Sequence, residues 1–82
     1  MISKTQLSKE LKTIVSDVSC VAGSSIQNST DLEKDLGIDS FNAAEILVAV
    51  EQKYKVTIDP AEVFSLRYFR QVVELVDAYV NK

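Results

Sequence analysis

Apolar residues recur along much of the chain at intervals of three and four, which is the spacing of one face of a helix. Ser3 and Gln6 have the spacing of a helix-capping box and precede the first such stripe. The pattern predicts a first helix over Lys4–Val18. Its apolar stripe consists of Leu7, Leu11, Ile14, Val15 and Val18.

The helical pattern stops between Ser19 and Asp39, where Gly, Ser and Asn residues predict a long polar loop. A loop of this length without regular structure is uncommon in a small domain. We expect Gly37 to adopt a turn conformation that a residue with a Cβ would resist. Four apolar side chains can attach the loop to the core: Ile26, Leu32, Leu36 and Ile38.

A second helix is predicted to begin at Asp39 or Ser40, both common N-cap residues, and to end near Tyr54. Its apolar arc is unusually wide, so we expect part of it to face a partner or a cargo molecule. Val56–Ile58 is too short to build a sheet and predicts an extended connection.

Asp59, Pro60 and Glu62 then form a strong helix-start signal, with an N-cap, a proline at the first position and an acid in the first turn. This signal predicts a short helix over Pro60–Leu66. A last helix is predicted to begin near Ser65 and to continue to the end of the chain. The prediction is an all-α bundle of three main helices plus one short helix, with the long loop between helices 1 and 2. We expect residues 1–82 to form a single domain.

Composition narrows the classes of function. The chain has 82 residues with no His, no Trp and one Cys, which excludes a Ser-His-Asp triad, a Cys-His pair and a metal site made of His and Cys. A self-contained enzyme is therefore not expected. We expect Cys20 to be a small buried side chain, and a single cysteine suits a reducing compartment. The sequence shows neither a secretion signal nor a membrane span, so we expect a cytoplasmic protein with no membrane partner.

The net charge of −3 is unevenly distributed. Six acids and the single base Lys34 lie between Asp31 and Glu51, so this window carries −5 and the rest of the chain +2. Such a window attracts basic partner surfaces, although a solvated acidic face is the alternative interpretation. No run of basic residues indicates a nucleic-acid partner.

The most informative segment is Leu36-Gly37-Ile38-Asp39-Ser40, at the junction of the long loop and the second helix. A pattern with four fixed positions arises by chance about once in 10⁴–10⁵ positions. Together with Asp35 before it and the apolar run Ile46–Val50 behind it, this segment resembles the attachment motif of acyl carrier proteins. The resemblance extends over nearly the whole chain and includes Tyr54-Lys55-Val56-Thr57-Ile58.

The resemblance implies that Ser40 receives a 4′-phosphopantetheine arm from coenzyme A and that Asp39 helps the phosphopantetheinyl transferase to place its metal and coenzyme. It also implies that Glu45 and Glu51 meet basic residues of acyl-transferring or condensing enzymes. Phe41, Ala44 and Val48 are candidates for the partner face or the entrance for an acyl chain, and core packing is the alternative for Phe41. Solvated helix surface is the alternative for the two glutamates.

The chemistry of Ser40 can also be considered without the family. No residue of the chain is placed to act as its general base, so Ser40 is expected to be a substrate of another enzyme. A phosphodiester there would sit at a helix N-terminus, where free N–H groups favour an anion. Plain helix capping by Asp39 and Ser40 is the alternative.

Some positions depart from the family pattern. Asn42, Gln52, Lys53 and Lys55 stand where carriers of fatty-acid synthesis are often acidic, and Arg67-Tyr68 replaces a common threonine cap. These departures favour a specialised free-standing carrier, for a polyketide, a modified acyl chain or another thioester, over general fatty-acid synthesis. Phe41 after Ser40 also occurs in D-alanyl carriers, so that cargo stays open.

Two further functions compete with the carrier. One is a helical interaction module that has the carrier fold but is never modified. The other is a regulatory bundle that works as a homodimer, with Ser40 as a helix cap. A carrier is expected to be a monomer, so the mass in solution separates it from the homodimer.

Overall fold

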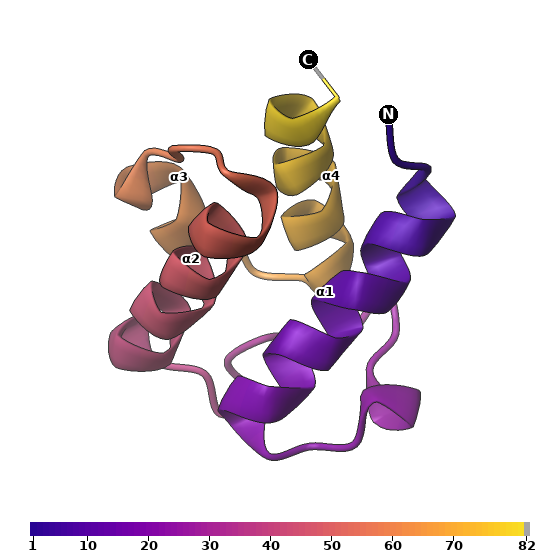
Figure 1. Cartoon of the computed structure of the whole chain (residues 1–82). Helices are drawn as coiled ribbons and strands as arrows, with labels where there is room; N and C mark the ends of the chain where they lie inside the picture. Colours follow the sequence, from indigo (N-terminus) through magenta and orange to yellow (C-terminus); the bar gives the residue numbers. More distant parts are fainter. Residues whose placement is uncertain (82) are drawn as a thin grey trace.

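The structure is a computed structural model that describes residues 1–81. Its elements are α1 (Lys4–Ser19), the 3₁₀ turn η1 (Gly23–Ser25), α2 (Ser40–Tyr54), α3 (Pro60–Phe64) and α4 (Phe69–Val80). Figure 1 shows α1, α2 and α4 as the three long elements, with α3 beside α2. The predicted all-α bundle with one short helix and a long first loop is confirmed. Within residues 1–81, no helix is long and apolar enough to span a bilayer.

The helix α1 begins as predicted and ends one residue later, at Ser19. Only half of the expected capping box forms, because the Ser3 hydroxyl accepts from the Gln6 amide while the Gln6 side chain donates to Glu10. The helix stops at Cys20, whose backbone is left-handed with φ 62°. Cys20 is exposed, so the expectation of a buried cysteine is wrong: as the C-cap, the residue lies beyond the apolar stripe of the helix.

The predicted bounds of α2 agree with the structure, but those of the two later helices differ. The helix α3 ends at Phe64 because the Ser65 hydroxyl donates to the Glu62 carbonyl and the Leu66 amide donates to Val63, which closes a turn. The helix α4 begins at Phe69, later than the predicted restart near Ser65. The Gln71 side chain accounts for this start, because its oxygen accepts from the amides of residues 67 and 68 at 2.8 and 2.9 Å and so caps the helix.

The core lies where α1, α2, α4 and the first loop meet. The helices α1, α2 and α4 contribute buried apolar side chains, and the four apolar side chains of the loop are buried as predicted. The largest fully buried side chains are Leu7, Leu11, Val15, Ile26, Val50 and Phe69. Burial of this kind stabilises a domain by about 25 cal/mol for each Å² of apolar surface removed from water.

The two ends of the chain lie together. The Ile2 amide donates to the Asn81 side chain at 3.0 Å, and the Asn81 side chain donates back to the Ile2 carbonyl at 2.6 Å. Asn81 also donates to Asp77, which fixes its orientation at the end of α4. In Figure 1 both ends lie at the top, whereas the first turn of α2 lies at the lower left.

Candidate functional site

The turn before α2 is set by Gly37. Its φ of +67° lies in the left-handed region that favours glycine. The Gly37 amide donates to Glu33, and the Ile38 amide donates back to Leu32, so the chain reverses within a few residues. Leu36 and Ile38 on either side of the glycine are buried, which fixes the direction in which the chain enters α2.

Asp39 and Ser40 stand at the N-terminus of α2. The Asp39 carboxylate accepts from the Asn42 amide at 2.9 Å, and the Asn42 side chain accepts from the Asp39 amide at 3.4 Å, which completes a capping box. Ser40 is the first residue of the helix, and both Asp39 and Ser40 are exposed. An exposed hydroxyl therefore stands where unsatisfied amides and the helix dipole favour a bound anion.

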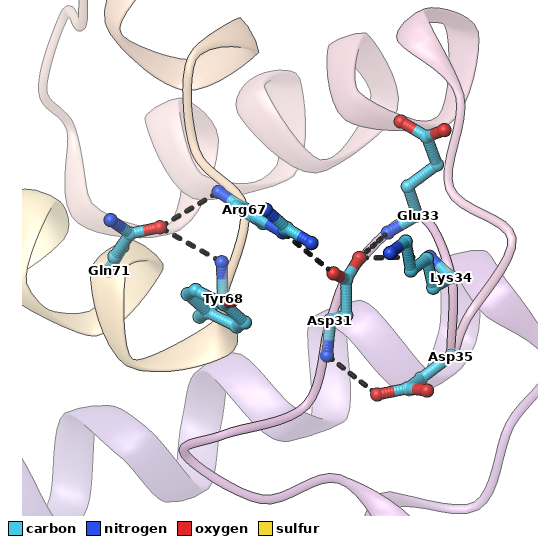
Figure 2. A network of polar contacts seen from close by, with 7 residues as sticks. All are labelled: Asp31, Glu33, Lys34, Asp35, Arg67, Tyr68 and Gln71. Carbon is cyan, nitrogen blue, oxygen red and sulfur yellow. Dashed lines mark hydrogen bonds and ion pairs between the residues drawn. The ribbon is translucent and has the colours of Figure 1, made fainter.

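Asp31 organises the loop that leads to this turn (Figure 2). Its side chain is largely buried, with a residue exposure of 7%. One carboxylate oxygen accepts from the amides of Glu33 and Lys34 at 3.0 and 2.9 Å, and the other accepts from Arg67 Nε at 2.9 Å. The Asp31 amide in turn donates to the Asp35 carboxylate at 2.8 Å. The hydrogen bond from the Lys34 amide, and then that from Arg67, holds the pKa of Asp31 below its usual value.

Backbone bonds join the same loop to the start of α4. The Leu32 amide donates to the Arg67 carbonyl at 2.8 Å, and the Phe69 amide donates to the Thr30 carbonyl at 3.0 Å. Asp31 and Tyr68 pair across this junction as an isolated antiparallel bridge. The loop is thus fixed to a segment far away in the sequence. This contact was not predicted, and Arg67 stood out only as a departure from the family pattern, since no local pattern pairs residues 31 and 67.

A cavity of about 500 Å³ has Ser40 in its lining. Its walls come from α2, α3, α4 and the loops that join them, and are mostly aliphatic. The polar and charged side chains of the lining are Asp31, Glu33, Lys34, Asp39, Ser40 and Arg67. This volume and lining are typical of sites for apolar small molecules. The apolar wall residues include Ile38, Ala43, Ile46, Leu47, Val50, Ile58, Val63, Leu66, Val72, Leu75 and Val76.

The predicted partner residues follow one stripe of α2 from Ser40 onward. Phe41 and Val48 are 70% and 51% exposed, so core packing, the alternative for Phe41, does not occur. Glu45 is also exposed, and Ala44 between them is half-buried. Residues 41, 44, 45 and 48 are three or four positions apart, so the helix brings them to one face.

Glu51 has a different environment. It is half-buried, and its carboxylate accepts from the Ile58 amide at 2.9 Å. This bond holds the extended connection between α2 and α3, so Glu51 has a structural contact that the sequence analysis did not predict. It lies at the far end of the stripe, away from Ser40.

The chain is similar in sequence to known proteins. Residues 9–76 match the family of the phosphopantetheine attachment site. The chain is similar to the acyl carrier protein of Kocuria rhizophila, at 31% identity over 77 residues, which is 94% of this chain and 95% of that protein. It is also similar to the acyl carrier protein of Trieres chinensis, at 29% identity over 68 residues, or 83% and 85% of the two chains.

Among solved structures, the fold is similar to the solution structure of the apo doublet acyl carrier protein from prodigiosin biosynthesis. The TM-score is 0.77 at 18% sequence identity. The match covers 93% of this chain and 37% of that one.

Proposed function

Since the chain belongs to the family of the phosphopantetheine attachment site, we propose that Ser40 is the residue that receives the arm. The protein is an acyl carrier and not a catalyst, and its covalent cofactor is 4′-phosphopantetheine. Phosphopantetheinyl transferase and biosynthetic enzymes are the partners of such carriers. Residues 1–82 act as one carrier domain in this proposal.

The observation that carries the proposal is the place of Ser40. Its hydroxyl is exposed at the first position of α2, behind a glycine turn and beside a cavity. In the attachment reaction, the Ser40 oxygen forms a bond to phosphorus while the bond between the two phosphates of coenzyme A breaks. Adenosine 3′,5′-bisphosphate leaves, and a base of the transferase takes the hydroxyl proton.

The residues around Ser40 fit the phosphodiester that results. The free amides of the first turn of α2 and the helix dipole stabilise the added negative charge. The neighbouring Asp39 carboxylate would be a ligand for a magnesium ion that accompanies the coenzyme, since carboxylate and phosphate oxygens are ligands that magnesium prefers. When attached, the arm supplies a terminal thiol that carries acyl groups as thioesters.

The cavity beside Ser40 supports a role in holding the acyl chain. Its aliphatic walls would remove the chain from water, and Ser40, where an attached arm begins, is one of its lining residues. Each buried CH₂ group contributes about 0.8 kcal/mol. We propose that the carrier keeps an aliphatic acyl chain in this cavity until an enzyme engages the arm.

The stripe of Phe41, Ala44, Glu45 and Val48 is the proposed docking face for partner enzymes, with Glu51 at its edge. It combines exposed apolar side chains with an acid beside the attachment serine. Basic residues on the enzymes would provide the complementary charge. The less acidic C-terminal end of α2, with Lys53 in the helix and Lys55 as its C-cap, favours a specialised carrier of polyketide or related synthesis that has dedicated enzymes.

The test is the intact mass after incubation with coenzyme A and a phosphopantetheinyl transferase of broad specificity. We expect a gain of one phosphopantetheine that is lost in Ser40→Ala. The matched control is Ser24→Ala, which changes an exposed serine of η1 and should keep the gain. If the folded protein gains no mass with several transferases, the unmodified interaction module becomes the better interpretation.

The homodimer is tested separately by sedimentation of the unmodified protein. A carrier should sediment as a monomer of 9.1 kDa at physiological salt. A stable dimer would favour the regulatory bundle.

A further inference from the structure

A second concave surface lies away from Ser40. It is formed by the first half of α1, loop residues 27–29 and the beginning of α4, and encloses about 830 Å³. We call it the basic groove, because four basic side chains line it against one acid, Glu74. The four bases are Lys4, Lys9, Lys12 and Arg70.

The charge of the basic groove opposes that of the whole chain. The groove residues sum to +3, while the protein carries −3. Within residues 1–81, the ion pairs are Lys53–Glu10 and Arg67–Asp31, so none of the four groove bases has an acidic partner within 4 Å. A cluster of unpaired charges in a concavity produces a local field that attracts groups of the opposite sign.

Several contacts fix the segments that form the basic groove. The Arg70 amide donates to the Asn28 carbonyl at 3.1 Å, which attaches the loop to α4. The Arg70 guanidinium lies 5.7 Å from the centre of the Tyr68 ring, within range of a cation–π contact. Val73 is a buried side chain in the lining. Neutral polar side chains complete the lining and offer both donors and acceptors: Thr5, Ser8, Gln27, Asn28 and Ser29.

From this arrangement we propose that the basic groove binds an acidic segment of a partner protein, rich in Asp and Glu. The carboxylates would pair with the four bases, and the polar lining would satisfy the peptide groups between them. No residue of α2 lines the groove, and neither does Ser40. A partner bound there therefore leaves the attachment serine and the docking face free.

A protein segment fits the groove better than a lipid surface or a nucleic acid. Among residues 1–81, the exposed large apolar side chains are Met1, Phe41, Val48 and Phe64, and none of them lines the groove to enter a bilayer. The lining also holds no aromatic ring on which a base could stack. What it offers is charge with amide and hydroxyl groups, which match a polar peptide.

Such binding would hold the carrier close to an enzyme while the arm acts elsewhere. A second contact raises the effective concentration of the carrier at the enzyme without making the catalytic contact tighter. Salt should weaken it strongly, because exposed charges are screened over about 8 Å at physiological ionic strength.

The experiment is an amide NMR titration of the full chain at low ionic strength, with a synthetic peptide of alternating Glu and Ser as probe. We expect shifts at residues 4–12, 27–29 and 70–74, and none at these residues with a peptide of alternating Lys and Ser. Lys9→Glu and Arg70→Glu should each weaken binding by about fivefold or more. The matched control is Lys55→Glu, which reverses an exposed base outside the groove and should bind like the original protein.

The proposal is wrong if the shifts spread over all basic residues or if the groove variants bind the probe as well as the control does. It is also overturned if concentrating the protein without the peptide shifts the amides of the groove residues together with those of α2. A second copy of the chain would then be the occupant of the groove. Preferential binding to vesicles with anionic lipid over the peptide would assign the groove to a membrane instead. Each variant should still gain phosphopantetheine at Ser40, which keeps this test separate from that of the carrier function.

Discussion

At the scale of single residues, Gly37 shows most directly how backbone conformation positions the site. It is the glycine with a positive φ, and a Cβ added there would meet no atom within 4 Å. The requirement for glycine is therefore one of backbone strain and not of space. The sequence predicted this role because Gly37 stands between two apolar residues just before a helix.

The first prediction follows from that distinction. Gly37→Ala should lower the free energy of unfolding by about 1 kcal/mol, the cost of a left-handed backbone for a residue with a Cβ. Chemical denaturation measures the loss. Gly23→Ala is the matched control, since its Cβ would make only an ordinary contact with the Lys12 carbonyl at 3.9 Å. Equal effects of the two substitutions would contradict this explanation.

Asp31 leads to the second prediction, which concerns pH. Its folded pKa lies below the unfolded value because of the bonds from Lys34 and Arg67, so its charged form stabilises the fold above the unfolded pKa of about 4. This contribution is lost as the pH falls through the folded pKa. Asp31→Asn keeps an acceptor for the loop amides but removes the charge that pairs with Arg67.

The measurement for Asp31 is the thermal unfolding midpoint of both proteins from pH 7 to pH 2. We expect Asp31→Asn to unfold at a lower temperature at pH 7 and the difference to narrow in the acid range. Asp17→Asn, at an exposed acid of α1, should follow the original protein throughout. If the difference between the two unfolding midpoints does not change with pH, the substitution destabilises the fold through the shape of the side chain and not through its charge.

At the scale of elements, the N-terminus of α2 combines structure and chemistry in one residue. Asp39 caps the helix and is proposed to assist attachment of the arm. The two roles separate because Asn caps a helix about as well as Asp, whereas only Asp supplies a carboxylate.

The third prediction uses this separation. Asp39→Ala should lower stability by about 1 kcal/mol, while Asp39→Asn should change it by less than about 0.5 kcal/mol. Both should slow attachment of phosphopantetheine by about tenfold or more, since both lose the carboxylate that is proposed to assist the attachment. Rates come from intact mass over time. Attachment to Asp39→Asn at the original rate would show that the carboxylate only caps the helix.

The fourth prediction concerns the exposed stripe of α2. Glu45→Lys should leave stability unchanged and slow acyl transfer by partner enzymes about threefold to tenfold at low ionic strength, because it reverses a charge on the proposed docking face. Kinetics with a partner enzyme at several salt concentrations measure this. Asp17→Lys makes the same change of charge on α1 and should have little effect. Unchanged rates for Glu45→Lys at low salt would remove Glu45 from the docking face.

The elements themselves were largely predictable. The spacing of Leu7, Leu11 and Val15 locates α1, and Pro60 after Asp59 locates the start of α3. The start of α4 was not predicted, because it depends on the Gln71 side chain reaching back to two amides. Side chains that cap over three or four residues leave only a weak signal among many polar residues.

At the scale of the whole molecule, the contacts between segments that are distant in the sequence could not be predicted. Ser40 and its turn could be identified from contiguous residues, but the ion pair of Asp31 and Arg67 and the basic groove could not. Their residues come from segments that carry no common pattern. The uneven distribution of charge could be read from the sequence, but the position of four basic residues around one concave surface depends on the fold.

The bonded ends of the chain have a consequence for engineering. Asn81 holds Ile2 at one end of the molecule, and the first turn of α2, which begins with Ser40, lies away from that end in Figure 1. A fusion or surface tether at either terminus would therefore leave the serine accessible. Adjacent ends also suit circular permutation, with a short linker across the termini and new ends opened in the exposed turn at Ser24 and Ser25. The same geometry would let this carrier be inserted into a surface loop of a host enzyme, as an internal module that delivers its arm away from the insertion point.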